Sequence, residues 1–197
     1  LELIFQRNYE VEHAFRSSVF QVVSFITTTG LYSDDAAKWP HVTWVVLAAC
    51  MFLGGSSGST SGGIKSIRGV MLVKIVKNEF RQILHPNAVL PMKIDGYNVQ
   101  MSKRVTLLAF IGLYLFLAVI CAFTMIAAGI DSTNSMTITL SSLGNVGPTL
   151  GLEIGPTMSW NELPDFAKWI SSFLMLVGRL ELFSVLVLFT PSFWKEN

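Results

Sequence analysis

The stretches that decide the fold are Ser24-Phe25-Ile26-Thr27-Thr28-Thr29-Gly30-Leu31-Tyr32 and Ser142-Leu143-Gly144-Asn145-Val146-Gly147-Pro148-Thr149-Leu150-Gly151. Each contains glycine beside small or polar residues. Each follows a segment too short to cross a membrane as a helix, residues 11–25 and 133–143. A longer helical segment comes after each turn. The order of short helix, turn, exposed loop and long helix therefore occurs twice, which predicts an internal repeat.

The composition indicates a protein embedded in lipid. Of the 197 residues, 51% are hydrophobic and only 14% are charged, whereas a soluble domain carries about 25% charged residues. The formal net charge is +1, which gives no sign of a nucleic-acid partner. We expect membrane lipid to surround the protein. Because the chain does not begin with Met, we expect it to be part of a longer one.

Three helical segments are long enough to cross a bilayer, which needs roughly 20 apolar residues. The clearest covers residues 103–130. The second is a broken helix over residues 39–82, in which a run of Gly, Ser and Thr at 54–63 separates an apolar part from a basic part. The third covers residues 164–190. The predicted fold class is therefore all-α and integral to the membrane.

These segments group into two units of helix, pore loop and helix. The first, residues 1–83, lacks its opening helix and has its turn at 26–32. The second, residues 103–197, is complete and has its turn at 144–149. The basic linker between them, residues 84–102, belongs in the cytoplasm by the positive-inside rule. Both turns then open to the outside, and the C-terminus lies in the cytoplasm.

The two turns are candidate cation-binding loops. Irregular backbone at membrane depth is tolerated only where protein buries it or water lines it, and its carbonyl oxygens can then replace the hydration shell of a bare cation. For either turn alone, an ordinary extracellular turn is an equally good interpretation; the matching places in a repeat favour cation binding. The candidate residues are Thr27, Thr28, Thr29, Gly30, Gly144, Asn145, Val146, Gly147 and Pro148, with the carbonyls of Thr28, Thr29, Asn145 and Val146 as predicted ligands.

The run at 54–63 and Arg179 form the candidate gate. A flexible surface linker would have the same composition, but both flanks of the run are needed to complete one span, which favours an unwound segment inside the bilayer. Arg179 is predicted to face the pore because a guanidinium in a membrane helix faces water or a partner and Glu181 lies on another side of the helix. A structural Arg paired with a neighbouring helix is the alternative. The gate residues are Gly54, Gly55, Ser56, Ser57, Gly58, Ser59, Thr60, Ser61, Gly62, Gly63 and Arg179.

Several separated motifs point to one family. The two turns parallel the Thr-Val-Gly-Tyr-Gly filter of potassium channels. The other motifs are the run at 54–65, Phe166-Ala167-Lys168-Trp169, and Gly178-Arg179-Leu180-Glu181-Leu182-Phe183 leading to Thr190-Pro191. In this order they resemble the TrkH-type membrane subunits of bacterial potassium uptake systems, within the Trk/Ktr/HKT superfamily, over essentially the whole chain.

The resemblance implies a pore of four helix–pore loop–helix repeats, of which this chain would hold the third, without its first helix, and the fourth. It implies potassium as the ion and the bacterial inner membrane as the location. It also implies a homodimer and a cytosolic ring of RCK domains, called TrkA in this subfamily, which carries the regulatory nucleotide. No organic cofactor is then expected in this chain.

Two other classes of function are weaker interpretations. A secondary transporter, coupling potassium to sodium or protons, also has broken helices and an intramembrane charge, but it does not call for two outward-opening turns at matching places. Coupling of the flux to another ion would identify it. An intramembrane enzyme would need paired carboxylates, a Ser-His pair or metal ligands within the helices. The sequence offers none of these, so an enzyme is not expected.

Overall fold

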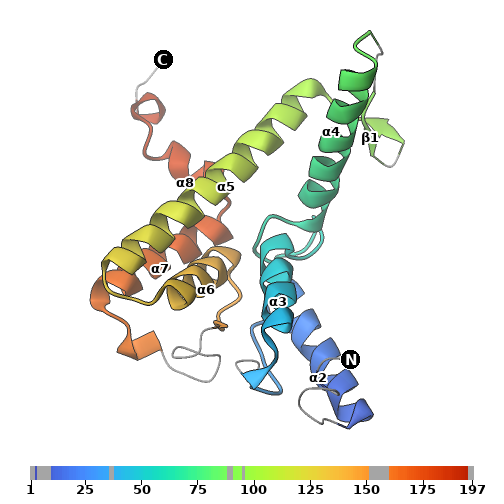
Figure 1. Cartoon of the computed structure of the whole chain (residues 1–197). Helices are drawn as coiled ribbons and strands as arrows, with labels where there is room; N and C mark the ends of the chain where they lie inside the picture. Colours follow the sequence, from blue (N-terminus) through green and yellow to red (C-terminus); the bar gives the residue numbers. More distant parts are fainter. Residues whose placement is uncertain are drawn as a thin grey trace.

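The computed structural model describes residue 3 and residues 10–35, 38–87, 91–94, 96–150 and 160–194. Within these residues the fold is mostly helical (Figure 1). The predicted cytoplasmic C-terminus lies outside them, as do parts of the predicted linker. The elements are α2 (Val11–Ile26), α3 (His41–Leu53), α4 (Ser66–Leu84), β1 (Lys93–Ile94), β2 (Tyr97–Asn98), α5 (Met101–Ala127), α6 (Ser132–Gly144), η2 (Trp160–Glu162), α7 (Asp165–Arg179), α8 (Leu182–Val187) and η3 (Pro191–Phe193).

The prediction of an all-α fold is wrong at one place, the linker before α5. Strands β1 and β2 pair antiparallel there, with Lys93 opposite Asn98 and Ile94 opposite Tyr97. Gly96 has φ 85°, which lets the chain reverse between the strands. The strands have two residues each, too few to show the alternating pattern by which strands are recognised.

Helix α5 is the one helix among the described residues that is long and apolar enough to cross a membrane. It ends before its predicted end at residue 130 because Gly129 adopts φ 91°. The Gly129 N–H donates to the Ile126 carbonyl (2.9 Å), and the Ile130 N–H donates to the Met125 carbonyl (3.3 Å). This is the Schellman arrangement, which satisfies the last carbonyls of a helix.

The predicted broken helix is two helices, α3 and α4, joined by residues 54–65, which we call the α3–α4 loop. Gly54, at φ 61°, ends α3, and Lys65, at φ 70°, precedes α4. The loop folds back on the end of α3, since the Ile64 N–H donates to the Phe52 carbonyl at 3.0 Å. The two helices are therefore tied together at the break.

The prediction of one helix over residues 164–190 is wrong, because the chain unwinds after Arg179. Helix α8 begins at Leu182, and the chain then enters η3 at Pro191. Between α7 and α8, Glu181 has φ 64°, a conformation that interrupts an α-helix. The break brings the Glu181 side chain to the cations at the start of α4.

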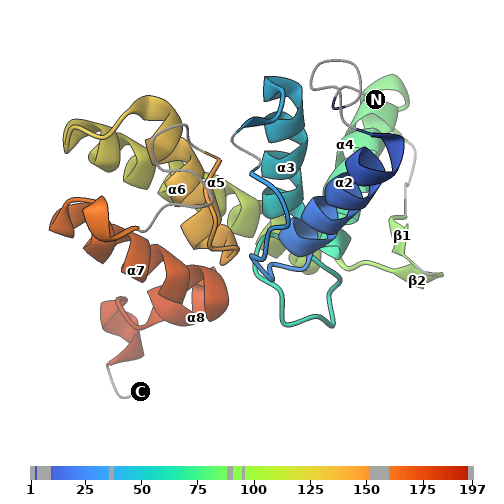
Figure 2. The same ribbon diagram turned by 90° about the horizontal axis from the view of Figure 1, so that it is seen from below.

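The helices form two groups that meet at the glycine turns. Helices α5, α6 and α7 share a core in which Met125 and Ile138 are fully buried. Helices α2 and α3 share a second core around Phe25 and Met51, and Val146, from the turn after α6, belongs to this second core. Figure 2 shows α6 and α7 on one side and α2 and α3 on the other. The turn after α6 therefore ties the two groups together.

Candidate functional site

The first predicted turn begins with a Schellman arrangement at the end of α2. Thr28 has φ 53°, and its N–H donates to the Phe25 carbonyl at 3.3 Å. The next N–H, that of Thr29, donates back to the Ser24 carbonyl at 2.9 Å. Gly30 then has φ 74°. The backbone therefore leaves the helix through one left-handed residue and turns again two residues later.

The second turn, at the end of α6, repeats this backbone step by step. Asn145 has φ 54°, and its N–H donates to the Ser142 carbonyl at 3.2 Å. The Val146 N–H donates to the Ser141 carbonyl at 3.0 Å, and Gly147 has φ 104°. The residues that align between the two turns in sequence therefore have the same hydrogen bonds and the same sign of φ.

The turns differ in how their left-handed residue is supported. Asparagine tolerates this conformation, whereas a β-branched threonine is strained in it. Thr28 is held from outside its own helix, since its Oγ1 accepts a hydrogen bond from the Gly62 N–H of the α3–α4 loop at 3.2 Å. The turn at Asn145 is held from within, since the Ser141 hydroxyl accepts from the Gly147 N–H at 3.0 Å. The first turn is also held from within, since the hydroxyl of Ser24, which aligns with Ser141, donates to the Leu31 carbonyl. The bond from the α3–α4 loop is therefore an additional support of the first turn.

The two turns touch through backbone atoms. A Cβ added to Gly30 would lie 2.1 Å from the Val146 carbonyl oxygen and 3.1 Å from Pro148 Cδ. Real Cβ atoms do not approach an oxygen so closely, and φ 74° is itself unfavourable for a residue with a side chain. Only glycine fits at this position. The structure therefore places the predicted cation-binding residues of both turns in one neighbourhood.

Three chain segments meet beside the second turn, again through glycines. A Cβ on Gly62 of the α3–α4 loop would lie 2.1 Å from the Gly144 carbonyl oxygen. A Cβ on Gly178 of α7 would lie 2.1 Å from the Leu143 carbonyl oxygen. The predicted gate loop therefore packs against Gly144, the first predicted ion-binding residue of the second turn, and the end of α7 packs against Leu143 directly before it.

The α3–α4 loop has its own hydrogen bonds, which a freely flexible linker lacks. The Gly55 N–H donates to Ser61 Oγ at 3.0 Å, and the Ser61 N–H donates to Ser59 Oγ at 3.1 Å. The Ser66 hydroxyl, at the start of α4, donates to the Gly55 carbonyl at 3.0 Å. Residues 54–55 and 61–62 are buried, while residues 56–58 are exposed. The loop is thus anchored at both ends and open in its middle.

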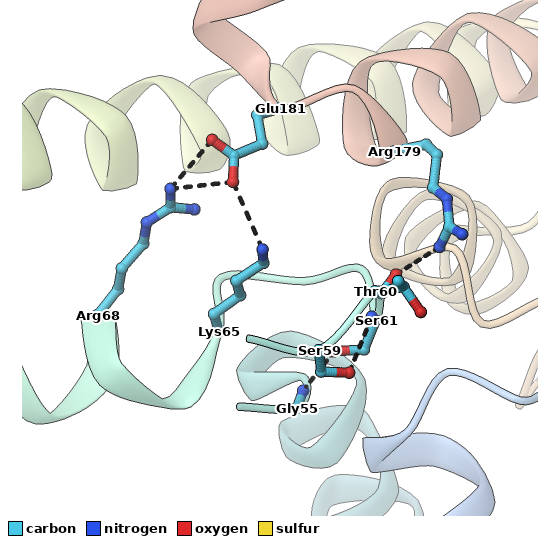
Figure 3. A network of polar contacts seen from close by, with 8 residues as sticks. All are labelled: Gly55, Ser59, Thr60, Ser61, Lys65, Arg68, Arg179 and Glu181. Carbon is cyan, nitrogen blue, oxygen red and sulfur yellow. Dashed lines mark hydrogen bonds and ion pairs between the residues drawn. The ribbon is translucent and has the colours of Figure 1, made fainter. Parts of the chain in front are cut away.

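Arg179 contacts the open middle of this loop. Its Nη1 donates to the Thr60 carbonyl at 2.5 Å (Figure 3). Arg179 is the last residue of α7, so a cation stands at the end of the helix where the partial negative charge of the backbone gathers. The two parts of the predicted gate are therefore in direct contact. Whether they regulate passage of an ion stays a prediction.

An ion cluster beside this contact was not predicted. The Glu181 carboxylate accepts two hydrogen bonds of 3.3 Å from Arg68 Nη2 and lies 3.5 Å from Lys65 Nζ (Figure 3). The Arg68 guanidinium also stacks 4.0 Å from the centre of the Phe110 ring. The signal in the sequence was a carboxylate inside an apolar segment, which needs a partner. The partners are far away along the chain, so spacing could not identify them.

A cavity of about 200 Å³ lies between these groups. Arg68, Arg179 and Glu181 line it, together with Tyr114, whose buried hydroxyl has no hydrogen-bond partner among the described residues. The described residues contain no cluster of His, Cys, Asp or Glu that could hold a metal ion. The polar chemistry of this region therefore consists of main-chain carbonyls, hydroxyls and the charges around the α3–α4 loop.

Comparison with protein families gives a match over nearly the whole chain. The profile of the TrkH family, described as "Cation transport protein", matches residues 5–196. The Trk system potassium uptake protein TrkH of Halomonas elongata is 36% identical over 189 residues, which cover 96% of this chain and 39% of that protein. The TrkH protein of Escherichia coli K12 is 39% identical over 177 residues, covering 90% of this chain and 36% of that protein.

A solved structure agrees with these matches. The crystal structure of the potassium transporter TrkH from Vibrio parahaemolyticus superimposes with a TM-score of 0.90 at 34% sequence identity. It covers 98% of this chain and 41% of that chain. The chain thus spans about two fifths of the length of the relatives it matches.

Proposed function

The chain belongs to the TrkH family of cation transport proteins, and we propose that it forms part of a potassium-selective pore in the bacterial inner membrane. The predicted family resemblance is confirmed, and the family transports cations rather than catalysing a reaction, as the sequence indicated. The observation that carries the proposal is the pair of turns with matching backbone, in contact through Gly30 and Val146. Carbonyl oxygens presented by such turns can replace the water around a bare potassium ion.

In this proposal each turn supplies one strand of a selectivity filter. The carbonyl oxygens of Thr28 and Thr29 in the first turn, and of Asn145 and Val146 in the second, are the potassium ligands. Two strands enclose only part of a ring, so the remaining strands come from parts of the full protein that this chain does not include. Its length, about two fifths of that of its relatives, leaves room for two further repeats.

The α3–α4 loop is the proposed gate below the filter. Two contacts support this role: Gly62 donates to Thr28 in the first turn, and Arg179 donates to Thr60 on the other side of the loop. The loop is thus attached to a proposed ion-binding strand and to a cation that repels potassium. A shift of the loop at Thr60, which accepts from Arg179, changes how far that cation stands from the path of the ion.

The proposed assembly follows from the relatives, which are named as proteins of the Trk system. We expect a homodimer surrounded by lipid, with its C-terminus in the cytoplasm. We also expect a cytosolic TrkA-type ring of RCK domains that binds the regulatory nucleotide. Co-purification of such a ring with the intact protein tests this part. Its absence would contradict the partner assignment and leave the filter proposal standing.

Coupled transport is the second candidate, and the helix breaks favour it. Both the α3–α4 and the α7–α8 connections interrupt helices, as in secondary transporters. Potassium flux through the intact protein in liposomes, measured with and without sodium or a proton gradient, separates the two. Flux down the potassium gradient alone supports a channel-like pore; an obligatory second ion supports coupled transport.

The proposed function is tested by rescue of a bacterium deficient in potassium uptake. The intact protein should restore growth at low external potassium. Gly30→Ala should abolish rescue, because its Cβ would overlap the Val146 carbonyl. Gly112→Ala is the matched control, since a Cβ there meets nothing within 4 Å. Rescue by Gly30→Ala equal to that by Gly112→Ala, at equal membrane levels, would contradict the filter assignment.

A further inference from the structure

A groove of about 790 Å³ runs along one face of α4 to the β1–β2 hairpin. This volume is within the range of ligand pockets, roughly 300–1,000 Å³. Leu53, at the end of α3, lines one end, and Met92, which is 2% exposed, lies beside the hairpin. The residues from α4 are spaced three and four apart and so share one helix face. They are Ser66, Gly69, Val70, Val73, Lys74, Lys77, Asn78 and Arg81.

The groove changes from apolar to cationic along this face. Val70 and Val73 are exposed near the start of α4, with Leu53 beyond them. Lys77 and Arg81 follow on the same face toward the end of α4. An elongated ligand with a hydrocarbon part and an anionic end matches this order, because each half then meets surface of its own kind.

The cationic end lacks acidic partners. Among the described residues, the carboxylates that form ion pairs bind other cations, and none is paired with Lys77 or Arg81. Lys74 Nζ donates to the Lys93 carbonyl at 2.8 Å, which joins α4 to the hairpin and adds the positive charge of Lys93 to the groove. An anion there would neutralise charges that the described part of the chain leaves uncompensated.

The groove lies next to the basic end of the helix that is long enough to cross a membrane. The hairpin leads directly into α5, whose first turn carries Lys103 and Arg104. Figure 1 shows the hairpin beside α4 and close to the start of α5. The positive-inside rule assigns this end to the cytoplasmic boundary, where the leaflet is rich in anionic lipids that attract clustered Lys and Arg.

We propose that this groove binds an anionic phospholipid of the cytoplasmic leaflet. One acyl chain lies along Val70 and Val73 toward Leu53, and the phosphate sits between Lys77 and Arg81. Inorganic phosphate would leave the apolar half unfilled, so the complete lipid is the ligand. The inference rests on the membrane placement proposed above. Its test measures lipid binding without measuring ion flux, so its failure is distinguishable from failure of the pore assignment.

Native mass spectrometry of the delipidated intact protein tests the proposal, with phosphatidylglycerol or phosphatidylcholine added in detergent. Phosphatidylglycerol should bind more tightly, and an excess of inorganic phosphate should not displace it. Lys77→Gln and Arg81→Gln should each weaken its binding about fivefold, the effect of one basic residue near an anionic lipid surface. Lys103→Gln, which removes a cation at the same boundary but outside the groove, is the matched control and should change little.

Val70→Trp separates binding in the groove from general attraction to a basic surface. Val70 is exposed, so the larger ring fills the apolar half without disturbing the core and leaves every charge in place. Phosphatidylglycerol binding should fall by about tenfold or more, because the acyl chain can no longer lie against the apolar half of the groove. Equal binding of the two lipids, a loss with Lys103→Gln as large as with Arg81→Gln, or full binding by Val70→Trp would each overturn the proposal. So would a change in oligomeric state instead of lipid binding, since a second copy would then occupy the groove.

Discussion

The turn after α2 and the turn after α6 have one backbone but two kinds of support. Both leave a helix through a left-handed residue, Thr28 or Asn145, with matching hydrogen bonds. The turn at Asn145 is fixed by its own helix, and residues 141–144 before it are buried. The turn at Thr28 is more exposed, and besides the bond from Ser24 to Leu31 within it, it accepts a bond from Gly62 of the α3–α4 loop. We therefore expect the turn at Thr28 to respond to changes in the α3–α4 loop more than the turn at Asn145 does.

The largest expected effect comes from Gly62→Ala, which keeps the N–H that donates to Thr28 but pushes the α3–α4 loop away from the second turn. The added Cβ would lie 2.1 Å from the Gly144 carbonyl oxygen. Overpacking of this kind costs about 1–3 kcal/mol or more. The thermal unfolding midpoint of the intact purified protein should fall, and potassium uptake should be lost. Gly58→Ala in the same loop is the control, because nothing lies within 4 Å of a Cβ there. An unfolding midpoint equal to that of Gly58→Ala would contradict the close contact of Gly62 with the second turn.

The next largest effect is expected from exchanging the left-handed residues of the two turns. Asn145→Thr places a β-branched residue at φ 54°, which should cost about 1–2 kcal/mol. Thr28→Asn relieves the corresponding strain but changes the group that accepts from Gly62. We expect the unfolding midpoint to fall for Asn145→Thr and to stay close to wild type for Thr28→Asn. Equal shifts for both would mean that the two turns are supported alike.

Arg179→Ala tests how firmly the loop is held opposite the first turn. The change removes the hydrogen bond to Thr60 and a cation near the proposed path. Potassium flux in liposomes should rise roughly two- to fivefold, because the loop loses the free energy of one hydrogen bond that holds it in place. Lys168→Ala removes a partly buried cation of the same helix, whose ion-pair partner is Asp165, and is the control. Unchanged flux, with normal amounts of the variant in the membrane, would show that Arg179 has only a structural role.

The smallest effect is expected for Glu181→Gln, which weakens the ion cluster beside the loop. The Glu181 side chain is 48% exposed, so its pairs with Arg68 and Lys65 contribute about 1 kcal/mol or less. The unfolding midpoint should fall slightly at low salt, and the difference from wild type should shrink as salt is added. A large loss that is independent of salt would show that the break after Arg179 depends on Glu181 for more than its charge.

The sequence predicted the parts of the site that depend on local backbone. Gly30 and Gly147 were aligned because both turns parallel the Thr-Val-Gly-Tyr-Gly filter pattern, and both glycines have positive φ in the structure. Helix α5 was recognisable because a long apolar segment without charge is typical of a membrane span. The predicted ends of α5 were less accurate, because Gly129 ends the helix although the apolar segment continues to Ile130.

Contacts between segments that lie far apart along the chain could not be predicted from the sequence. At the break after α7, Glu181 forms ion pairs with Lys65 and Arg68, which lie directly before α4 and within it. Gly178 was named only as part of a family motif, yet its missing side chain lets α7 approach the Leu143 carbonyl. Neither the partner of a charge nor the neighbour of a glycine is encoded in local spacing, so the structure was needed to show them.

In the proposed pore the two turns present their carbonyl oxygens to one potassium pathway. Anomalous scattering from crystals of the intact protein, with potassium replaced by rubidium, tests it most directly. We expect rubidium peaks in contact with the carbonyl oxygens of Thr28 and Thr29 and with those of Asn145 and Val146. Peaks elsewhere in the protein, with none at either turn, would contradict it.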